Sequence, residues 1–568
     1  MSPDPHDGDD HDHDHPHVDG LPVRHAILRP GAVATGAVIA AVFAIVAQFR
    51  SVFAGLVWDD RVFLVEDARV QSLTSVWRSF TEAFFTADHP TEMYRPLVNA
   101  SLAIDWFVSG SAPGAPRTWW FHAVNLLLHA VNAGLVYVLF ANLTKRRLGA
   151  PLIAAVLFAV HPLAVEPVTW IVGRCDLLAA TCGLASAILL VRSPGKARLL
   201  WASVALWGLG LFAKASIATL PLIVALALVA YHQVEPRRFL TLRLAKRFAA
   251  FAIPAAVWIA ARCAVLGAPF PVKDGRVWKD VGVLDAFQGV GRAVWVQTAH
   301  VFVPVRLCGD YAGDAAWTPG GAPWDASSIL GLVLLALAFG VGAWLLRRHA
   351  AGFPLLAYGV ALVPVLQIVP IGAIFADRFL YVPMAFLLLL VAEGLEHLYY
   401  RWGALRGLSV TLLLFATLPV LSHLRAGVWR DEVTFQRDVI ANYPAAPDGT
   451  YRLAKALSET GRAEDRAEAK DMLRRAVAVH TRPDDELSLL GALLLEDGEL
   501  FDAEATLRRA IDVAGGKPRV GAIARYNLAV CLKRTQRSGS HEMRRLLEEA
   551  LRRAPDLAAA RTLLDSLR

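Results

Sequence analysis

The chain alternates between long apolar blocks and short polar segments from about residue 31 to residue 424, and this alternation restricts what it can fold into. A helix needs about 20 apolar residues to span the hydrocarbon core of a bilayer. Hydrophobic residues make up 55% of the chain and charged residues only 19%, whereas soluble proteins carry about 25% charged residues. The composition excludes a disordered chain, a disulfide scaffold and an ordinary soluble enzyme. We therefore predict an all-α membrane protein that ends in a soluble region.

Eleven apolar blocks are predicted to cross the membrane. One further segment, 289–304, carries Arg292, Gln297 and His300. If it crossed completely, the last two basic loops would face outwards and break the positive-inside pattern, so we predict that it is re-entrant or lies along the interface. The eleven predicted crossings are 31–49, 120–143, 148–163, 177–191, 199–213, 216–231, 248–267, 328–346, 353–371, 379–398 and 407–424.

Basic residues fix the predicted orientation. Arg24 and Arg29 precede the first crossing, and alternate loops after it are again rich in arginine and lysine. Such residues collect on the cytoplasmic side, so we place the N-terminus there. The segments that then share the non-cytoplasmic side with the C-terminal region are 50–119, 161–176, 268–288, 305–327 and 372–378.

Three domains follow from the change in composition along the chain. Residues 1–29 include a run rich in His and Asp, which predicts a disordered cytoplasmic tail without a fixed metal-ligand geometry. Residues 30–425 form the predicted membrane domain with its large outer loop, 50–119. Residues 426–568 form a soluble, non-cytoplasmic domain that is rich in Ala, Leu, Arg and acidic residues.

The C-terminal domain contains an internal repeat. Four similar fragments align on Ala441, Ala476, Ala510 and Ala550, with spacings of 35, 34 and 40 residues. A 34-residue helix–turn–helix period is typical of tetratricopeptide repeats, in which the small alanine allows close helix packing and a glycine closes the first helix. Gly461 and Gly498 occupy that closing position. Such stacks bind extended chains or protein partners, although a helical cap without a ligand is the alternative.

Charge and cysteine content limit the partners. The net charge of +7 does not indicate nucleic acid, because much of the basic excess lies in short segments between apolar blocks. The five cysteines show no CxxC or Cys/His spacing of a metal site. We therefore predict buried free thiols, no resident metal and no nucleic-acid partner.

Two adjacent acids, Asp59 and Asp60, follow Trp58 at the outer end of the first crossing. Carboxylates at a membrane edge are costly unless they are hydrated, paired or used. One of them could act as a general base that takes a proton from an attacking hydroxyl. The alternative is a pair of acids that caps a helix or a loop.

Further charged and aromatic residues lie at the same predicted membrane depth on separate segments. Arg and Lys side chains match a phosphate well, so these residues predict a membrane-edge pocket for an anionic lipid headgroup with a carboxylate base nearby. The alternative is mutual neutralisation in loop ion pairs. The residues are Tyr94, Arg95, His161, Glu166, Arg174, Asp176, Lys214, Asp377, Arg378 and Tyr381.

The chain also contains six motifs in a fixed order: VWDD (57–60), YRPL (94–97), FHAVNLLLHAVNAGL (121–135), FAVHPLAVEPVTWIVGRCDLLAA (158–180), FAKAS (212–216) and DRFLYVP (377–383). Together with the C-terminal repeats, they resemble the transmembrane and tetratricopeptide-repeat-containing O-mannosyltransferase family. The resemblance covers about residues 31–568, and the block 158–180 is its most specific part.

The resemblance implies the GT-C glycosyltransferase fold. Such enzymes take a sugar from a polyprenyl-phosphate carrier and place it on an acceptor at the non-cytoplasmic face. Eukaryotic members use dolichyl-phosphate mannose and Ser/Thr hydroxyls. The family often has Glu after a lysine where this chain has Lys214-Ala215. The motifs place the catalytic acids at Asp59 and Asp60, the second outer-loop motif at Glu166, Arg174 and Asp176, and a contact for the carrier phosphate at Arg378.

From the resemblance we expect a membrane glycosyltransferase that moves mannose or another hexose from a polyprenyl-phosphate carrier to a hydroxyl. The expected acceptor is Ser or Thr of an exported protein, which the repeats present. Low lysine content and an Ala/Arg bias suggest a GC-rich bacterium. The expected location is then the bacterial inner membrane, with periplasmic active-site loops and repeats.

Each candidate residue has an expected role. Asp59 is the base and Asp60 orients or binds. The carrier phosphate is expected at Arg378, with Arg95, Arg174 or Lys214 assisting. The residues expected to shape the site are Tyr94, His161, Glu166, Asp176, Asp377 and Tyr381.

Several alternatives remain open. No cofactor is indicated, and a divalent metal between the acids and the phosphate is an option for which no ligand set is compelling. Other functions are a non-catalytic scaffold whose repeats recruit envelope proteins, and a lipid-linked transferase that acts on a glycan or a lipid. A lipid or glycan transporter ranks lowest, because the polar residues cluster outwards.

Overall fold

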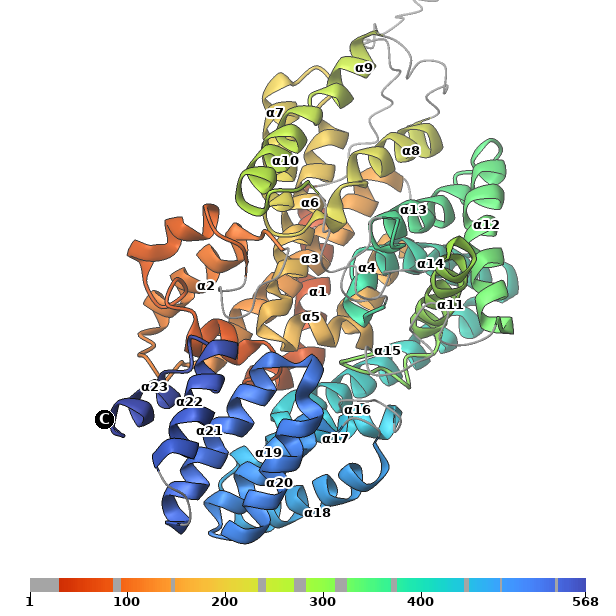
Figure 1. The fold of residues 1–568 in the computed structure, drawn as a ribbon. Coiled ribbons are helices and arrows are strands. Elements are labelled where there is room, and N and C mark those ends of the chain that lie inside the picture. Colours follow the sequence, from red (N-terminus) through yellow and green to blue (C-terminus); the bar gives the residue numbers. More distant parts are fainter. Residues whose placement is uncertain are drawn as a thin grey trace, which may run out of the picture. The chain divides into compact units, whose positions relative to one another are not determined.

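The computed structural model of the chain (Figure 1) describes residues 30–84, 93–144, 149–232, 242–269, 282–311, 324–368, 375–443, 449–480, 483–536 and 540–567. Within these ranges the chain is helical, and the one β-feature is an isolated bridge between Ala112 and Ala115. The predicted all-α fold with membrane-type helices is confirmed. The predicted tail, 1–29, lies outside the described residues.

The chain divides into two compact units. The first, which we call the membrane unit, comprises Met1–Leu307 and Thr318–Trp429. The second, which we call the repeat unit, comprises Cys308–Trp317 and Arg430–Arg568. The sequence alone suggested a boundary after residue 425, but it gave no reason to group 308–317 with the C-terminal region.

The α-helices of the membrane unit follow one another with short 3-10 turns between some of them. They are α1 (Pro30–Gln48), α2 (Pro96–Ser109), α3 (Thr118–Thr144), α4 (Gly149–Val160), α5 (Val165–Thr169), α6 (Arg174–Arg192), α7 (Ala197–Leu211), α8 (Leu220–His232), α9 (Leu242–Ala249), α10 (Ala252–Leu266), α11 (Val283–Phe302), α12 (Ala326–Leu346), α13 (Gly352–Leu362), α14 (Pro383–Trp402) and α15 (Ala404–Ala426). Near the centre of the unit, α1 packs against α3 and α4, and α3 packs against α6 (Figure 1).

Each of the eleven predicted crossings contains one of these helices. Among the described residues, six helical segments are long and apolar enough to cross a membrane, and a seventh is formed if the bent pair Gly149–Val160 and Pro162–Thr169 counts as one span. The number of crossings therefore stays a prediction. The six segments are Pro30–Phe53, Thr118–Thr144, Ile171–Arg192, Ala245–Leu266, Ala326–Leu346 and Leu405–Arg430.

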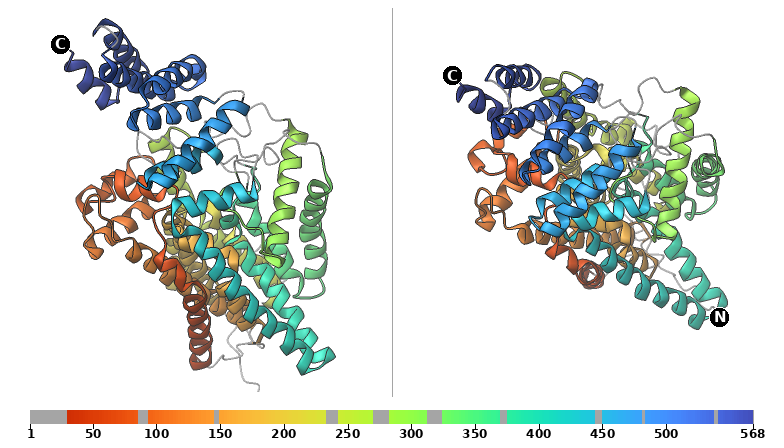
Figure 2. Two further views of the ribbon diagram at one scale, coloured as in Figure 1. Left: turned by 90° about the horizontal axis from the view of Figure 1, so that it is seen from below. Right: turned by 60° about the horizontal axis from the view of Figure 1, so that its bottom comes forward.

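The uncertain segment 289–304 lies largely on α11, which is one helix without a break. It runs beside α12 (Figure 2), where a Cβ atom built on Gly331 would lie 1.7 Å from the carbonyl oxygen of Gly291. Arg292, Gln297 and His300 are buried. A re-entrant path needs a turn, and α11 has none, so the re-entrant or interfacial position of 289–304 stays a prediction.

The chain between α4 and α6 is irregular and buried throughout. After α4, the His161 side chain accepts the N–H of Leu163 at 3.2 Å and shares a hydrogen bond of 3.0 Å with the carbonyl oxygen of Val301. The helix axis bends by 53° at this point. The turns η4 (Pro162–Ala164) and η5 (Ile171–Gly173) flank α5. Irregular backbone is tolerated at membrane depth only inside protein, and every residue from 154 to 177 is buried here.

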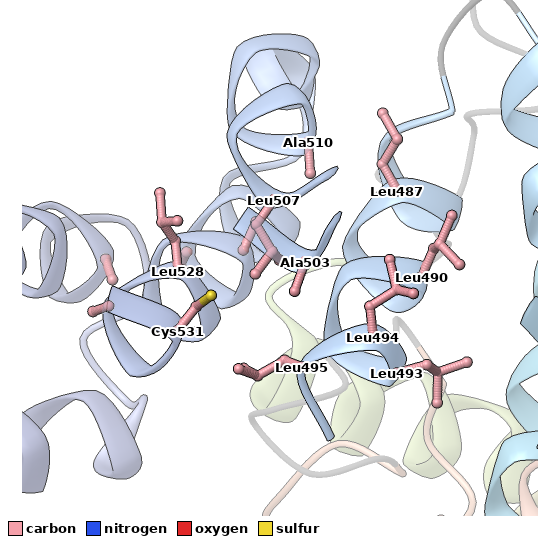
Figure 3. Packing of buried hydrophobic residues seen from close by; sticks show 14 of the residues in the cluster. Leu487, Leu490, Leu493, Leu494, Leu495, Ala503, Leu507, Ala510, Leu528 and Cys531 are labelled. Carbon is pink, nitrogen blue, oxygen red and sulfur yellow. The ribbon is translucent and has the colours of Figure 1, made fainter. Parts of the chain in front are cut away.

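The repeat unit is an array of helices (Figures 1 and 2). Its core is a continuous row of leucine and alanine side chains from successive helices (Figure 3). The helices are α16 (Glu432–Asn442), α17 (Gly449–Glu459), α18 (Ala463–Val479), α19 (Asp484–Glu496), α20 (Leu500–Val513), α21 (Pro518–Thr535), α22 (Ser540–Arg553) and α23 (Ala558–Asp565).

The repeat glycines lie at the predicted helix ends, and three of the four aligned alanines are buried. Gly461 and Gly498 have φ angles of +74° and +80°, which other residues rarely adopt, and they end α17 and α19 as predicted. The alanines on α18, α20 and α22 are buried at helix contacts, whereas Ala441 on α16 is exposed. Ala441 differs from the other three in its exposure, because it lies on α16, the first helix of the array. That these hairpins are tetratricopeptide repeats stays a prediction.

A short piece of the loop between α11 and α12 belongs to the repeat unit. The Asp310 carboxylate pairs with Arg452 on α17 at 2.6 Å. The ring of Tyr311 packs against Tyr443 with centroids 5.6 Å apart. Gly309 lies so close under the ring of Phe435 that a Cβ atom there would overlap it. These contacts attach the loop to the first helices of the array.

Candidate active site

Asp60 ties the first outer loop to the turn after α5. Its fully buried carboxylate accepts the backbone N–H groups of Val172 (3.1 Å), Ile171 (3.4 Å) and Val57 (3.4 Å). Burial raises the pKa of the Asp60 carboxyl well above its usual value, although the three backbone donors oppose the rise, and the charge of Asp59 adds to it. Asp60 is therefore held between the first outer loop and the turn after α5.

Asp59 is half-buried and follows a strained residue. The N–H of Asp60 donates to the carbonyl oxygen of Val57 at 3.2 Å and closes a turn with Trp58 and Asp59 at its centre. Trp58 has a φ of 58°, a left-handed conformation that costs an L-residue about 1–2 kcal/mol. Its ring stacks on Trp170 with centroids 5.1 Å apart. Such a pair gains about 0.5–1.5 kcal/mol beyond its burial.

Arg378 lies on η10 (Asp377–Leu380), beside this ring pair. Its guanidinium carbon is 5.5 Å from the ring centroid of Trp58 and 5.0 Å from that of Trp170. Its Nη1 forms an ion pair with Glu166 of α5, and its backbone N–H donates to the same carboxylate at 2.9 Å. Arg378 thus lies over the ring pair whose first member, Trp58, directly precedes the two acids in the chain.

Two further cations approach the start of α6. Lys214 binds both carboxylate oxygens of Asp176, at 2.6 and 2.8 Å. Arg95 donates to the sulfur of Cys175 at 3.5 Å. Arg95, Lys214 and Arg378 all lie within electrostatic range of that sulfur, which locates the three cations together.

The three cations differ in their partners. Arg378 and Lys214 each have a carboxylate partner, whereas no carboxylate among the described residues lies within ion-pair distance of Arg95. The half-buried Arg95 instead lies over the ring of Phe84, 5.3 Å from its centroid. Three cations and two carboxylates leave this cluster with one formal positive charge. We call the group formed by Arg95, Lys214, Arg378, Glu166 and Asp176 the cation cluster.

The Arg174 side chain, by contrast, is buried and has its partners inside the protein. Its side chain is 1% exposed, and it pairs with Asp105 of α2. It also donates to the Asn125 side chain at 2.7 Å and to the carbonyl oxygen of Phe121 at 2.9 Å. Every nitrogen of the guanidinium therefore has an internal partner. A role of Arg174 in phosphate binding stays a prediction that this geometry does not favour.

The aromatic and histidine candidates also hold internal partners. The hydroxyl of Tyr94 donates to the carbonyl oxygen of Phe80 at 2.9 Å. The hydroxyl of Tyr381 lies 2.8 Å from His129 Nδ1 and accepts from Asn132 at 3.2 Å. His161 is the buried residue at the end of α4 described above.

Asp377 is buried and lies 3.3 Å from the imidazole of His300 on α11. Its charge also acts on Glu166, so it lies at the edge of the cation cluster. The candidates brought together are therefore the acid pair, the cation cluster and Asp377. Tyr94, His161, Arg174 and Tyr381 support the surrounding helices and turns.

Some residues of the site were not among the predicted ones. Asp105 could have been found from the sequence, because a lone acid within an apolar helix needs a buried partner. Asn125, on the helix predicted at 120–143, donates to the carbonyl oxygens of Trp170 and Ile171 at 3.1 and 3.3 Å. Trp58 and Trp170 lie within the motifs 57–60 and 158–180 but were given no role, because the stacking of their rings depends on the fold.

Among the described residues, no group of three or more His, Cys, Asp or Glu side chains is arranged to hold a metal ion. These residues offer no ready ligand set for the divalent ion that the sequence left as an option. The fold and the site together define a helical membrane protein with an acid pair beside a buried cation cluster.

No protein-family model matches the chain. Curated relatives are named protein O-mannosyl-transferases, and the resemblance to that family is confirmed. Tmtc2 of Drosophila melanogaster is 37% identical over 145 residues, which are 25% of this chain and 15% of that protein. F38B6.6 of Caenorhabditis elegans is 23% identical over 426 residues, 72% of this chain and 58% of that protein. Tmtc3 of Drosophila melanogaster is 25% identical over 473 residues, 68% of this chain and 49% of that protein. The chain thus spans 15% to 58% of the length of these relatives.

Proposed function

We propose that the chain is a membrane glycosyltransferase that transfers a hexose, such as mannose, from a polyprenyl-phosphate carrier to a hydroxyl group of an exported protein. One observation carries the proposal: the acid pair and three cations from separate segments converge around Trp170 and Cys175. The names of the relatives support a transferase that acts on proteins.

The charge of the cation cluster suits this donor. A sugar linked to polyprenyl phosphate is a phosphodiester with one negative charge, and the cluster has one formal positive charge. Arg95, which has no carboxylate partner among the described residues, is the cation best able to bind the phosphate without breaking an existing ion pair. Arg378 and Lys214 add charge to the same region, and arginine can bind phosphate with two hydrogen bonds.

The reaction follows from these positions. The oxygen of the acceptor hydroxyl attacks the anomeric carbon, and its proton passes to the Asp59 carboxylate. The bond between the anomeric carbon and the phosphate oxygen breaks, and the electron pair leaves with polyprenyl phosphate. That phosphate gains a second negative charge, which the cation cluster stabilises. The sugar is transferred with inversion, and Asp59 then releases its proton to water.

Asp60 has a positioning role in this scheme. It holds the 57–60 turn against Ile171 and Val172, so that Asp59 and the Trp170 ring keep a fixed relation. The half-buried Asp59 is the acid of the pair that serves as the base in this scheme.

We place the reaction at the non-cytoplasmic face, where the repeat unit presents the acceptor. Asp310 and Arg452 support part of this placement, because a contact between them requires the α11–α12 loop and the array to share one compartment. The distribution of basic loops supports a cytoplasmic N-terminus.

Transfer by the purified full chain in lipid nanodiscs tests the proposal. Polyprenyl-phosphate mannose and polyprenyl-phosphate glucose are supplied with a Ser/Thr-rich peptide, and the peptide mass is recorded. We expect a hexose on the peptide with the parent chain, and a loss of about 10²- to 10⁴-fold with Asp59→Asn. Asp512→Asn, which removes an exposed acid of the repeat unit, is the control that keeps full activity.

The other outcomes separate the alternatives. Carrier binding without peptide transfer points to a glycan or lipid acceptor. A parent chain that neither binds nor transfers the sugar points to the scaffold function.

A further inference from the structure

The strained conformation of Trp58 is the starting observation. Among the described residues, only Trp58, Gln367 and Gln536 combine a positive φ with a side chain. Glycine or asparagine would adopt this conformation at less cost, whereas a bulky residue is an outlier there. Strained residues of this kind cluster at ligand-binding sites.

The turn at Trp58 does not itself require a tryptophan. It is held by Asp60, whose carboxylate binds the backbone on both sides. The ring of Trp58 stacks on Trp170 and lies beside Arg378, which are residues of the candidate site. These contacts point to a reason for a tryptophan at this position.

The location of Trp58 supplies a reason for a tryptophan at this position. Trp58 directly precedes Asp59, the proposed base, and its ring lies 5.5 Å from the guanidinium carbon of Arg378. In the proposed reaction the sugar lies between the attacking hydroxyl and the departing phosphate. A ring that belongs to the residue before Asp59 and lies beside Arg378 is therefore well placed to meet the sugar.

Trp170 adds a second, independent observation. Its side chain is buried, and its indole N–H has no hydrogen-bond partner among the described residues. A buried donor without an acceptor is unfavourable, and such groups in native proteins are rare. A sugar hydroxyl is a suitable acceptor for this N–H.

We propose that the stacked rings of Trp58 and Trp170 form the surface on which the hexose of the lipid-linked donor packs. The C–H face of a hexose is apolar and fits an aromatic ring, while its hydroxyls keep polar partners. This inference rests on the proposed function, and it adds that the protein recognises the sugar and not only the phosphate carrier.

Binding of two carriers by the full chain in nanodiscs tests this inference. The dissociation constants of polyprenyl phosphate and polyprenyl-phosphate mannose are measured for the parent chain, Trp58→Phe, Trp58→Asn and Trp58→Gly. We expect the parent to prefer the mannosylated carrier. Trp58→Asn and Trp58→Gly keep the backbone conformation but lack the ring, so this preference should fall about tenfold, while Trp58→Phe retains most of it.

The control is Trp77→Asn, which removes a 62% exposed tryptophan of η3 (Leu73–Phe80) and should leave both constants unchanged. The inference is overturned if the ring-free variants keep the parent's preference, if Trp58→Phe loses as much as Trp58→Gly, or if the parent binds the two carriers equally. If the parent binds neither carrier, the proposed function itself fails.

Discussion

Arg378 binds Glu166 through both its side chain and its backbone, with the backbone N–H 2.9 Å from Glu166 Oε2. The two side chains are 13% and 3% exposed, so the pair lies largely in the protein interior. Glu166 belongs to the irregular chain between α4 and α6, and Arg378 to η10. The pair therefore sets the position of the proposed phosphate-binding cation relative to the turn that Asp60 holds.

Loss of one member of this pair should destabilise the chain. Arg378→Gln leaves the Glu166 carboxylate buried without its partner, which costs about 3–5 kcal/mol. The double variant Glu166→Gln/Arg378→Gln should regain most of that stability in thermal unfolding, because no charge is left unpaired. It should still transfer no sugar. A double variant as active as the parent would show that Arg378 is only structural.

The two acids should respond differently to amidation. Asp59→Asn should lower transfer about 10²- to 10⁴-fold, because the amide cannot accept the proton of the acceptor hydroxyl. Asp60→Asn should lower stability by about 1–3 kcal/mol, because the amide N–H₂ would face backbone N–H donors. Thermal unfolding and transfer are measured on the same preparations. Equal losses of activity without any loss of stability would contradict this division of roles.

Arg95 should affect donor binding without affecting stability. Among the described residues Arg95→Gln leaves no carboxylate unpaired, so we expect a change in unfolding free energy within about 0.5 kcal/mol. A charge-assisted hydrogen bond contributes about 1.5–3 kcal/mol, which corresponds to roughly tenfold to hundredfold weaker binding of the lipid-linked sugar. Arg78→Gln, a half-exposed arginine of the same loop, should bind the donor normally. Unchanged donor affinity in Arg95→Gln would remove Arg95 from the site.

The array of the repeat unit should weaken in acid. The hydrogen bond from Lys470, assisted by Arg466, lowers the pKa of Asp497 below its usual value. Because the folded state has the lower pKa, this stabilisation is complete above the unfolded pKa of about 3.9 and disappears as the pH falls through the folded value. Thermal unfolding of the full chain between pH 7 and pH 3 measures the effect. Lys470→Met should reduce the loss of stability between pH 7 and pH 3. An unaltered pH profile in this variant would refute the role of the Lys470–Asp497 contact.

The contact between the α11–α12 loop and the array is tested by charge exchange. Asp310 is 9% exposed and Arg452 is 38% exposed in their ion pair. Asp310→Arg should loosen the loop and increase its cleavage by protease, and the added Arg452→Asp should restore resistance. Glu459→Gln, on α17 but outside the pair, is the control. An Asp310→Arg variant that is cleaved no faster than the parent would mean that the pair does not hold the loop.

The sequence predicted the helices well because their signal is local. Each long apolar block forms a helix, and the break at His161–Pro162 follows from proline chemistry. The family resemblance suggested different roles for Asp59 and Asp60. The sequence could not show that Asp60 binds the backbone of Ile171 and Val172. That contact joins residues more than a hundred positions apart.

The arrangement of the cations was harder to predict for the same reason. Arg174 looked equivalent to Arg95 in sequence, yet it pairs with Asp105 in the interior while Arg95 has no such partner among the described residues. The choice of partner depends on how α2 packs beside α3 and α6, which no local pattern encodes. The positive φ of Trp58 could not be predicted from the sequence either, because tryptophan rarely adopts this conformation.

A cryo-EM structure of the chain with bound polyprenyl-phosphate mannose would locate the donor relative to the acid pair and the cation cluster. We expect the donor phosphate within hydrogen-bond distance of Arg95, with Arg378 or Lys214 beside it, and the anomeric carbon facing Asp59. A donor phosphate bound away from all three cations, or a sugar that points away from Asp59, would contradict the proposed site.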